Sequence, residues 1–179
     1  SIMNYEMSNN FNYEMNKLTI ITIVLIFLVV LFTFKSLIIP FILVLLIQCA
    51  VYILMGVINI LDMKVYYLSL LIVQSILMGA TIDYAILFTN YYRELRKENS
   101  IRISLKETYN KSIHTIFTSS LIMIIITGVL GFVFKDPAIG EICHIIAIGV
   151  TIAVLLILFV LPSIIVLFDK KIVKNKFKS

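Results

Sequence analysis

Asp83 is the residue in this sequence best suited to proton chemistry, because it is an acidic side chain deep inside the apolar run from Leu77 to Phe88. A carboxylate in the hydrocarbon of a bilayer costs about 2.5 to 3.5 kcal/mol on insertion scales, and such residues are functional by default. Loss of water disfavours the ionised form, so we expect this group to bind and release a proton near neutral pH. Nine residues separate Asp83 from Tyr92, about 13 Å of helix, which places it near the bilayer midplane. The alternative is a protonated carboxyl group that only ties helices together.

A later apolar run supplies hydroxyl groups that we expect as relay partners: Thr115, Thr118, Ser119 and Ser120. Counted from a helix start near Lys111, Ser119 is about 12 Å deep, which matches the depth of Asp83. These hydroxyls can donate to a carboxylate or hold water. They can equally bond back to the carbonyls of their own helix.

Two neighbours of Asp83 have distinct expected roles. Gly79 lies one turn earlier on the same face and would let a neighbouring helix approach closely. Tyr84 is rotated by about 100° from Asp83, so it faces a different neighbour and can share a proton relay through water.

The composition places these residues in a membrane. Of 179 residues, 61% are hydrophobic and 14% are charged, whereas a soluble domain is about half apolar and a quarter charged. This surplus cannot be hidden in one small core, which excludes a water-soluble globular enzyme. Disorder is excluded as well, because disordered chains lack β-branched and aromatic residues.

The fold class that follows is all-α, a polytopic bundle of five transmembrane helices. Each run is near the roughly 20 residues that a spanning helix needs, and none alternates as a barrel strand does. The predicted spans are residues 18–34, 37–61, 65–92, 113–134 and 138–168, together forming a domain over 18–168. We expect residues 1–17 as an extracytoplasmic lead-in, 93–111 as an amphipathic segment on the inner leaflet, and 169–179 as a basic cytoplasmic tail.

The basic residues predict the orientation of the bundle. Lys35, the segment 93–111 and the tail 170–178 share one side, and they hold 12 of the 15 Lys and Arg residues. Basic loops stay on the cytoplasmic side, so we expect a multi-pass protein of the cell membrane with its N-terminus outside and its C-terminus inside. The net charge of +5 then reflects topology and attraction to lipid headgroups, and we expect no nucleic-acid partner.

The motifs and cysteine spacing in this sequence do not support an enzyme, a metal site or a disulfide. An intramembrane aspartyl protease needs two facing aspartates, and a rhomboid-type protease needs a Gly-x-Ser-Gly motif that is absent. Cys49 and Cys143 lie in or beside apolar runs without metal-ligand or disulfide spacing. We therefore expect no catalytic residue, no metal and no cofactor, with protons as the only coupling ion.

Several motifs, in order along the chain, resemble the MMPL branch of the resistance-nodulation-division (RND) superfamily. The segment from Gly79 through Asp83-Tyr84 to Tyr92-Arg93-Glu94 is similar to the Gly-x-x-x-Asp-Tyr…Arg-Tyr-Arg-Glu signature. Phe34-Lys35-Ser36, Thr118-Ser119-Ser120 and Leu161-Pro162-Ser163 resemble three further motifs of that family.

This resemblance implies a proton-motive-force-driven exporter of lipids or other hydrophobic molecules, with Asp83 and Tyr84 as the proton relay. It implies helices two to six, or eight to twelve, of a protein built from two pseudo-symmetric halves. The expected partners are membrane lipids, the other half or a second copy, and an extracytoplasmic domain outside this segment. The absence of an initiator Met agrees with an internal piece of a longer chain. A sterol-sensing-domain-like lipid sensor and a SecD/SecF-like protein-export component remain alternatives.

Overall fold

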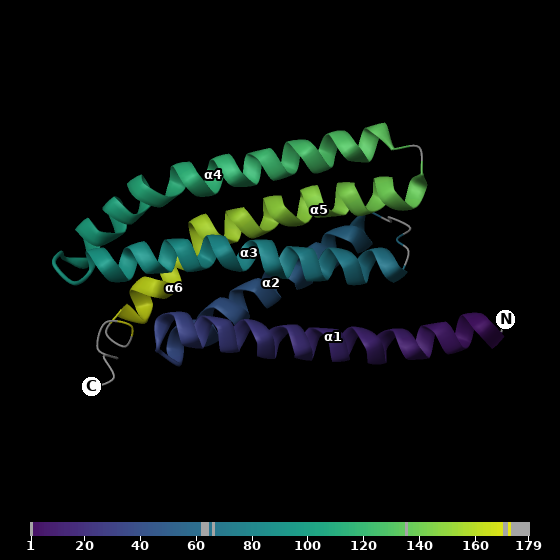
Figure 1. Cartoon of the computed structure of the whole chain (residues 1–179), viewed down its shortest axis with the longest axis horizontal. Helices are drawn as coiled ribbons and strands as arrows, with labels where there is room; N and C mark the ends of the chain where they lie inside the picture. The colour runs from purple at the N-terminus through teal and green to yellow at the C-terminus, as the bar shows by residue number, and fades with distance from the viewer. Residues whose placement is uncertain (1, 62–64, 66, 135, 170–171, 173–179) are drawn as a thin grey trace.

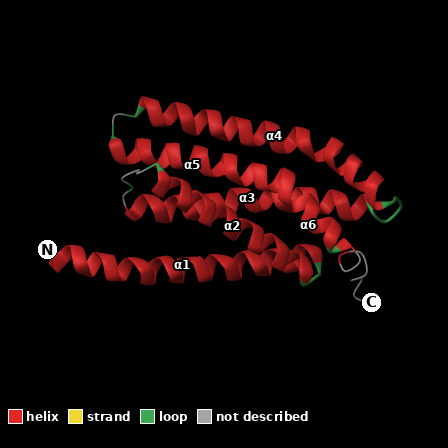
Figure 2. Cartoon of the chain, turned by 180° about the vertical axis from the view of Figure 1, so that it is seen from behind, coloured by secondary structure: helices red, strands yellow, loops and turns green. Residues whose placement is uncertain are grey.

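The protein, described from a computed structural model, is an antiparallel helical bundle over residues 2–61, 65, 67–134, 136–169 and 172. Its elements are α1 (Ile2–Phe34), α2 (Ile38–Ile60), α3 (Tyr67–Leu95), α4 (Ile101–Val133), α5 (Pro137–Leu155), the π-helical turn η1 (Leu156–Val160) and α6 (Leu161–Leu167). No strand occurs among these residues (Figure 2). Five helical stretches are long and apolar enough to cross a membrane, which confirms the predicted fold class.

The helices alternate in direction, so their connections collect at two ends of the bundle (Figure 1). The α1–α2 and α3–α4 turns and the end of α6 lie together at one end. We call this the basic end, because Lys35, Arg93 and Arg96 lie there. The guanidinium of Arg93 donates to the carbonyl oxygen of Phe34 at 3.1 Å and lies 5.4 Å from the centre of its ring. The structure thus places these charges, which the sequence assigned to one side, at one end of the bundle, whereas the lysines of the expected basic tail lie outside the described residues.

The core lies between α2, α3 and α5, with α1 and α4 on opposite outer sides (Figure 1). Apolar side chains fill it, among them the fully buried Leu43, Leu46, Leu77, Met78, Ile145 and Ile157. A Cβ atom added to Gly149 would lie 3.1 to 3.2 Å from Leu54 and Leu77. The glycine in α5 therefore permits the close packing of α2, α3 and α5.

The expected boundaries differ from the structure at two places. The lead-in 1–17 continues into the first span as the single helix α1, and α4 begins at Ile101, inside the segment expected as a separate inner-leaflet helix. The buried face of α4 repeats every four residues: Ser104, Thr108, Ser112, Ile116 and Ser120. Small residues at this spacing let two helices approach closely, so packing through hydroxyl-bearing side chains joins the two predicted segments into one helix.

Back-bonding makes most of these hydroxyls compatible with an apolar interface, whereas the buried hydroxyl of Ser104 has no hydrogen-bond partner among the described residues. Thr108 donates to the carbonyl of Ser104, and Ser112 donates to that of Thr108, both at 2.7 Å. A hydroxyl in an apolar surrounding needs a hydrogen-bond partner, and the helix itself supplies it here.

The last span is interrupted near the basic end. Pro162 has no N–H, so the carbonyl of Leu158, four residues earlier, loses its usual helical partner. The chain forms the π-helical turn η1 at this point, and the hydroxyl of Tyr109 in α4 donates to the Leu158 carbonyl. The ring of Tyr109 packs edge-on against Phe88 of α3, with centroids 5.3 Å apart. Tyr109, which belongs to the segment expected on the inner leaflet, thus links α4 to both α3 and the last span.

We predict that Tyr109→Phe destabilises the protein by about 1–3 kcal/mol, because it leaves the Leu158 carbonyl without a partner. In a Pro162→Ala background the loss should be clearly smaller, since alanine at this position restores a backbone N–H. Thermal unfolding of the four proteins of this double-mutant cycle in detergent micelles measures the coupling. Equal losses in both backgrounds would contradict the assigned hydrogen bond.

Candidate functional site

Asp83 lies on the outer surface of this five-helix bundle. It is in the middle of α3, and its side chain is exposed, as are Ile76, Gly79 and Asn90 on the same side of the helix. The opposite side of α3 carries the buried Leu77, Ala85, Phe88 and Tyr92. The apolar core therefore fixes the rotation of α3 and directs the carboxyl group away from the bundle.

Tyr84 and Gly79, the two neighbours of Asp83 on α3, have different surroundings. Tyr84 is half-buried against the core, one position around the helix from the carboxyl group. A Cβ atom on Gly79 would have nothing within 4 Å. The close helix approach expected at Gly79 is thus not made by any described part of this chain.

Three of the expected hydroxyl partners lie together on the outer face of α4. Thr115, Thr118 and Ser119 are exposed and, with His114 and Ile122, line an open cavity of about 370 Å³. Ser120 is separate from them, because its side chain is buried and its hydroxyl donates to the carbonyl of Phe117 at 3.0 Å. Among the described residues, no hydrogen bond joins Asp83 to any of these four hydroxyls.

The contact between Phe88 and Tyr109 sets the depth of Asp83 against α4. Because the two helices are antiparallel, Asp83, five residues before Phe88, is level with His114, five residues after Tyr109. Asp83 therefore lies at the depth of His114 and Thr115, and Ser119 is about 7.5 Å further along α4. The depth match with Ser119 assumed that the helix starts near Lys111, whereas α4 begins at Ile101. His114 is thus a neighbour of Asp83 in depth that was not among the partners expected from the sequence.

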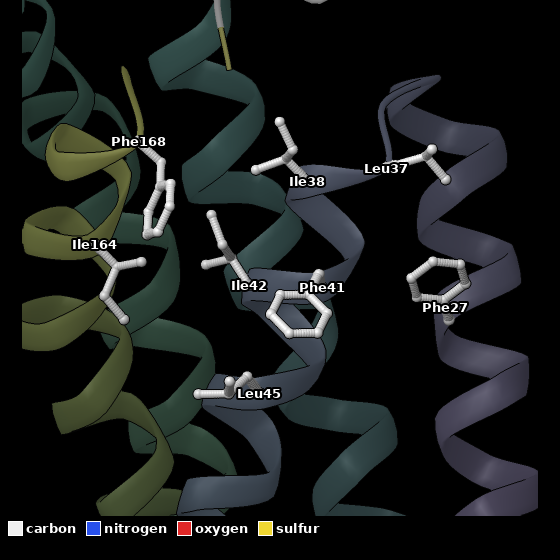
Figure 3. A pocket seen from close by; sticks show the side chains of 8 residues that line it. All are labelled: Phe27, Leu37, Ile38, Phe41, Ile42, Leu45, Ile164 and Phe168. Carbon is white, nitrogen blue, oxygen red and sulfur yellow. The ribbon is translucent and has the colours of Figure 1, made fainter. Parts of the chain in front are cut away.

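A second cavity, of about 480 Å³, opens between α1, α2 and α6 (Figure 3). Its floor is formed by Ile38, Phe41, Ile42 and Leu45 of α2, and it is flanked by Phe27 of α1 and by Ile164 and Phe168. Every lining residue is apolar. This cavity offers dispersion contacts to hydrocarbon and no group that can bind a proton, so it is a weaker candidate for chemistry than the surface around Asp83.

A buried polar cluster at the basic end was not predicted from the sequence. The hydroxyl of Tyr92 donates to Oδ1 of Asp169 at 2.7 Å, and Arg96 donates to both carboxylate oxygens at 3.0 and 3.1 Å. Tyr92 and Arg96 are four residues apart, so they share one helix face, and this spacing was the available signal. Asp169 was assigned to the basic tail, because nothing local distinguishes it from a solvated residue.

The part of the chain that the structure describes holds no group of three or more His, Cys, Asp or Glu residues able to bind a metal ion. The groups that could exchange protons on the outer surfaces of α3 and α4 are the carboxyl group of Asp83 on α3 and the hydroxyls and imidazole that line the cavity on α4. Such groups in a bilayer are typical of ion and proton pathways.

Comparison with known proteins identifies the family of the chain. The family model described as MMPL family matches residues 1–178, nearly the whole chain. No curated protein matches the chain. With five helices long and apolar enough to span a membrane and a family match over nearly its whole length, the chain belongs to the MMPL family, whose members are RND-type membrane transporters.

Proposed function

We propose that this chain is the transmembrane part of a proton-motive-force-driven exporter of lipids or other hydrophobic molecules, with Asp83 and Tyr84 as the proton relay. The observation that carries the proposal is the outward-facing carboxyl group of Asp83 at mid-depth in α3. A transporter coupled to protons needs a group that changes its charge inside the membrane, and Asp83 is the carboxyl group placed to do so.

The exposure of Asp83 supports a partner for this bundle. A carboxyl group turned towards lipid is costly, and intramembrane acids almost always face protein or a water-filled cavity. Gly79, with open space above it, lies on the same face and suits close contact with another helix. The partner is the other pseudo-symmetric half of the transporter or a second copy of this chain, covering the outer surface of α3.

The open cavity on α4 supports a path for the proton. His114 and Thr115 are level with Asp83, and Thr118 and Ser119 continue the polar surface along the helix. Water held by these groups beneath a covering partner would link the carboxyl group to the aqueous phase. Ser120 is a poorer relay partner, because its hydroxyl is buried and already donates to Phe117.

We predict that Asp83→Asn abolishes proton-coupled export by the complete protein, because it removes proton binding at nearly constant shape. Glu94→Gln is the matched control: Glu94 lies eleven residues later on the same exposed face of α3, at the basic end. Export is measured as loss of a fluorescent hydrophobic compound from membrane vesicles on imposing a proton gradient, after checking equal expression. Sustained export by Asp83→Asn would refute the relay and favour a sensor function.

We predict that Ser119→Cys, in a Cys49→Ala background, reacts readily with a maleimide in the isolated five-helix chain and at least tenfold more slowly in the complete protein. Ser119 is exposed here, and the proposed partner would cover it. Cys49 is removed because it is exposed, whereas Cys143 is buried. Equal reaction rates in the two proteins, followed by mass spectrometry, would exclude a partner over this surface.

We predict that the basic end is cytoplasmic, because basic loops are retained on that side. An epitope tag fused after Ser179 should be labelled by antibody only after the cell membrane is permeabilised. Labelling of the tag in intact cells would reverse the orientation.

A further inference from the structure

We propose that Tyr92, Arg96 and Asp169 form a latch that holds the basic end of α6 against α3, and that Asp169 is the positioning residue of this latch. This inference stands apart from the proposed export function. It rests on the hydrogen bonds at the basic end and on the interruption of the last span by η1.

The latch binds the carboxylate of Asp169 from two side chains of one helix. Arg96 donates through Nε and Nη2 to the two carboxylate oxygens, which is the two-point geometry of strong Arg–carboxylate pairs. Tyr92 adds a third hydrogen bond from a fully buried ring. The remaining Nη1 of Arg96 donates to the carbonyl of Asn99 at 2.7 Å, so the α3–α4 turn is held by the same guanidinium.

Burial makes this contact sensitive to the loss of either partner. Asp169 is 4% exposed, and a buried carboxylate without its cation is strongly unfavourable. The carboxylate also raises the pKa of Arg96, so the guanidinium stays charged at any physiological pH.

The latch does not belong to the proton relay. Tyr92 follows Asp83 by nine residues, which is a rotation of about 180° around α3. Asp83 is exposed on one side of the helix, and Tyr92 is buried on the other. A change at Asp169 therefore acts on how α3 and α6 are held together, without touching the carboxyl group at mid-depth.

The interruption at η1 explains why α6 needs a separate attachment. The last span is packed against α3 on both sides of η1, through Gly149 near Leu77 and through Asp169. Between these points the helical hydrogen-bond pattern is broken, because Pro162 has no N–H and Tyr109 bonds the Leu158 carbonyl instead. Such π-helical turns are common at functional positions. The segment beyond η1 is held by the packing of Leu161 and Ile165 and, at its end, by the hydrogen bonds to Asp169. Loss of those hydrogen bonds would let its end separate from α3 while α5 stays packed.

The test is hydrogen exchange of the complete protein in lipid nanodiscs, read by mass spectrometry over peptides covering residues 156–169 and 139–155. Asp169→Asn should speed exchange over 156–169 at least tenfold and leave 139–155 unchanged. Glu98→Gln is the matched control, because Glu98 is an exposed acid at the same end. The double variant Arg96→Asp with Asp169→Arg should restore slow exchange, since it exchanges the two charges.

Two further results decide the proposal if Asp169→Asn does not fold. Tyr92→Phe removes only one hydrogen bond, and it should speed exchange over the same peptides by a smaller factor. Unchanged exchange over 156–169 in Tyr92→Phe, or faster exchange spread equally over all five spans, would overturn the latch. None of these measurements depends on transport. The latch and the proposed relay at Asp83 are therefore tested independently, and either can be refuted without the other.

Discussion

The absence of water from the hydrocarbon core is the constraint on which this structure depends. Polar groups there need protein partners, and many of the described polar groups obtain them in recurring ways. Hydroxyls in α4 donate to carbonyls of their own helix, and Tyr109 donates to the carbonyl that Pro162 leaves unpaired. At the basic end, Asp169 is buried only because Arg96 and Tyr92 surround its carboxylate.

Asp83 differs from these paired polar groups. Its carboxyl group lies at mid-depth on an exposed side of α3, without a hydrogen bond from any described residue. The remainder of α3 is well packed, with a buried side that carries Phe88 and Tyr92. The helix therefore has two different sides, one packed within the chain and one that carries exposed residues such as Asp83.

The two surfaces of α3 also separate stability from the proposed transport. The buried side holds the bundle together, through apolar packing along its length and an ion pair at its end. The exposed side carries the only carboxyl group expected to change its charge at mid-depth. A protein arranged in this way can alter the contacts of Asp83 without dismantling its own core.

The sequence alone predicted a bundle with five helices long and apolar enough to span a membrane, the position of Asp83 in the middle of the third, and the grouping of Lys35 with Arg93 and Arg96 at one end. These properties follow from local hydropathy and from the fixed rise of a helix, so a single segment suffices to read them. Family membership was equally accessible, because its motifs are short and occur in order.

Only the tertiary structure decided which residues meet. The level of Asp83 against His114 follows from the contact of Phe88 with Tyr109, and the start of α4 at Ile101 follows from packing through its buried hydroxyl-bearing face. Asp169 resembles any charge in a basic tail until α6 places it beside Tyr92 and Arg96, 77 and 73 residues earlier in the chain. Hydropathy reports the preference of each residue for lipid or water, whereas register and rotation arise from side chains that are distant in sequence and close in space.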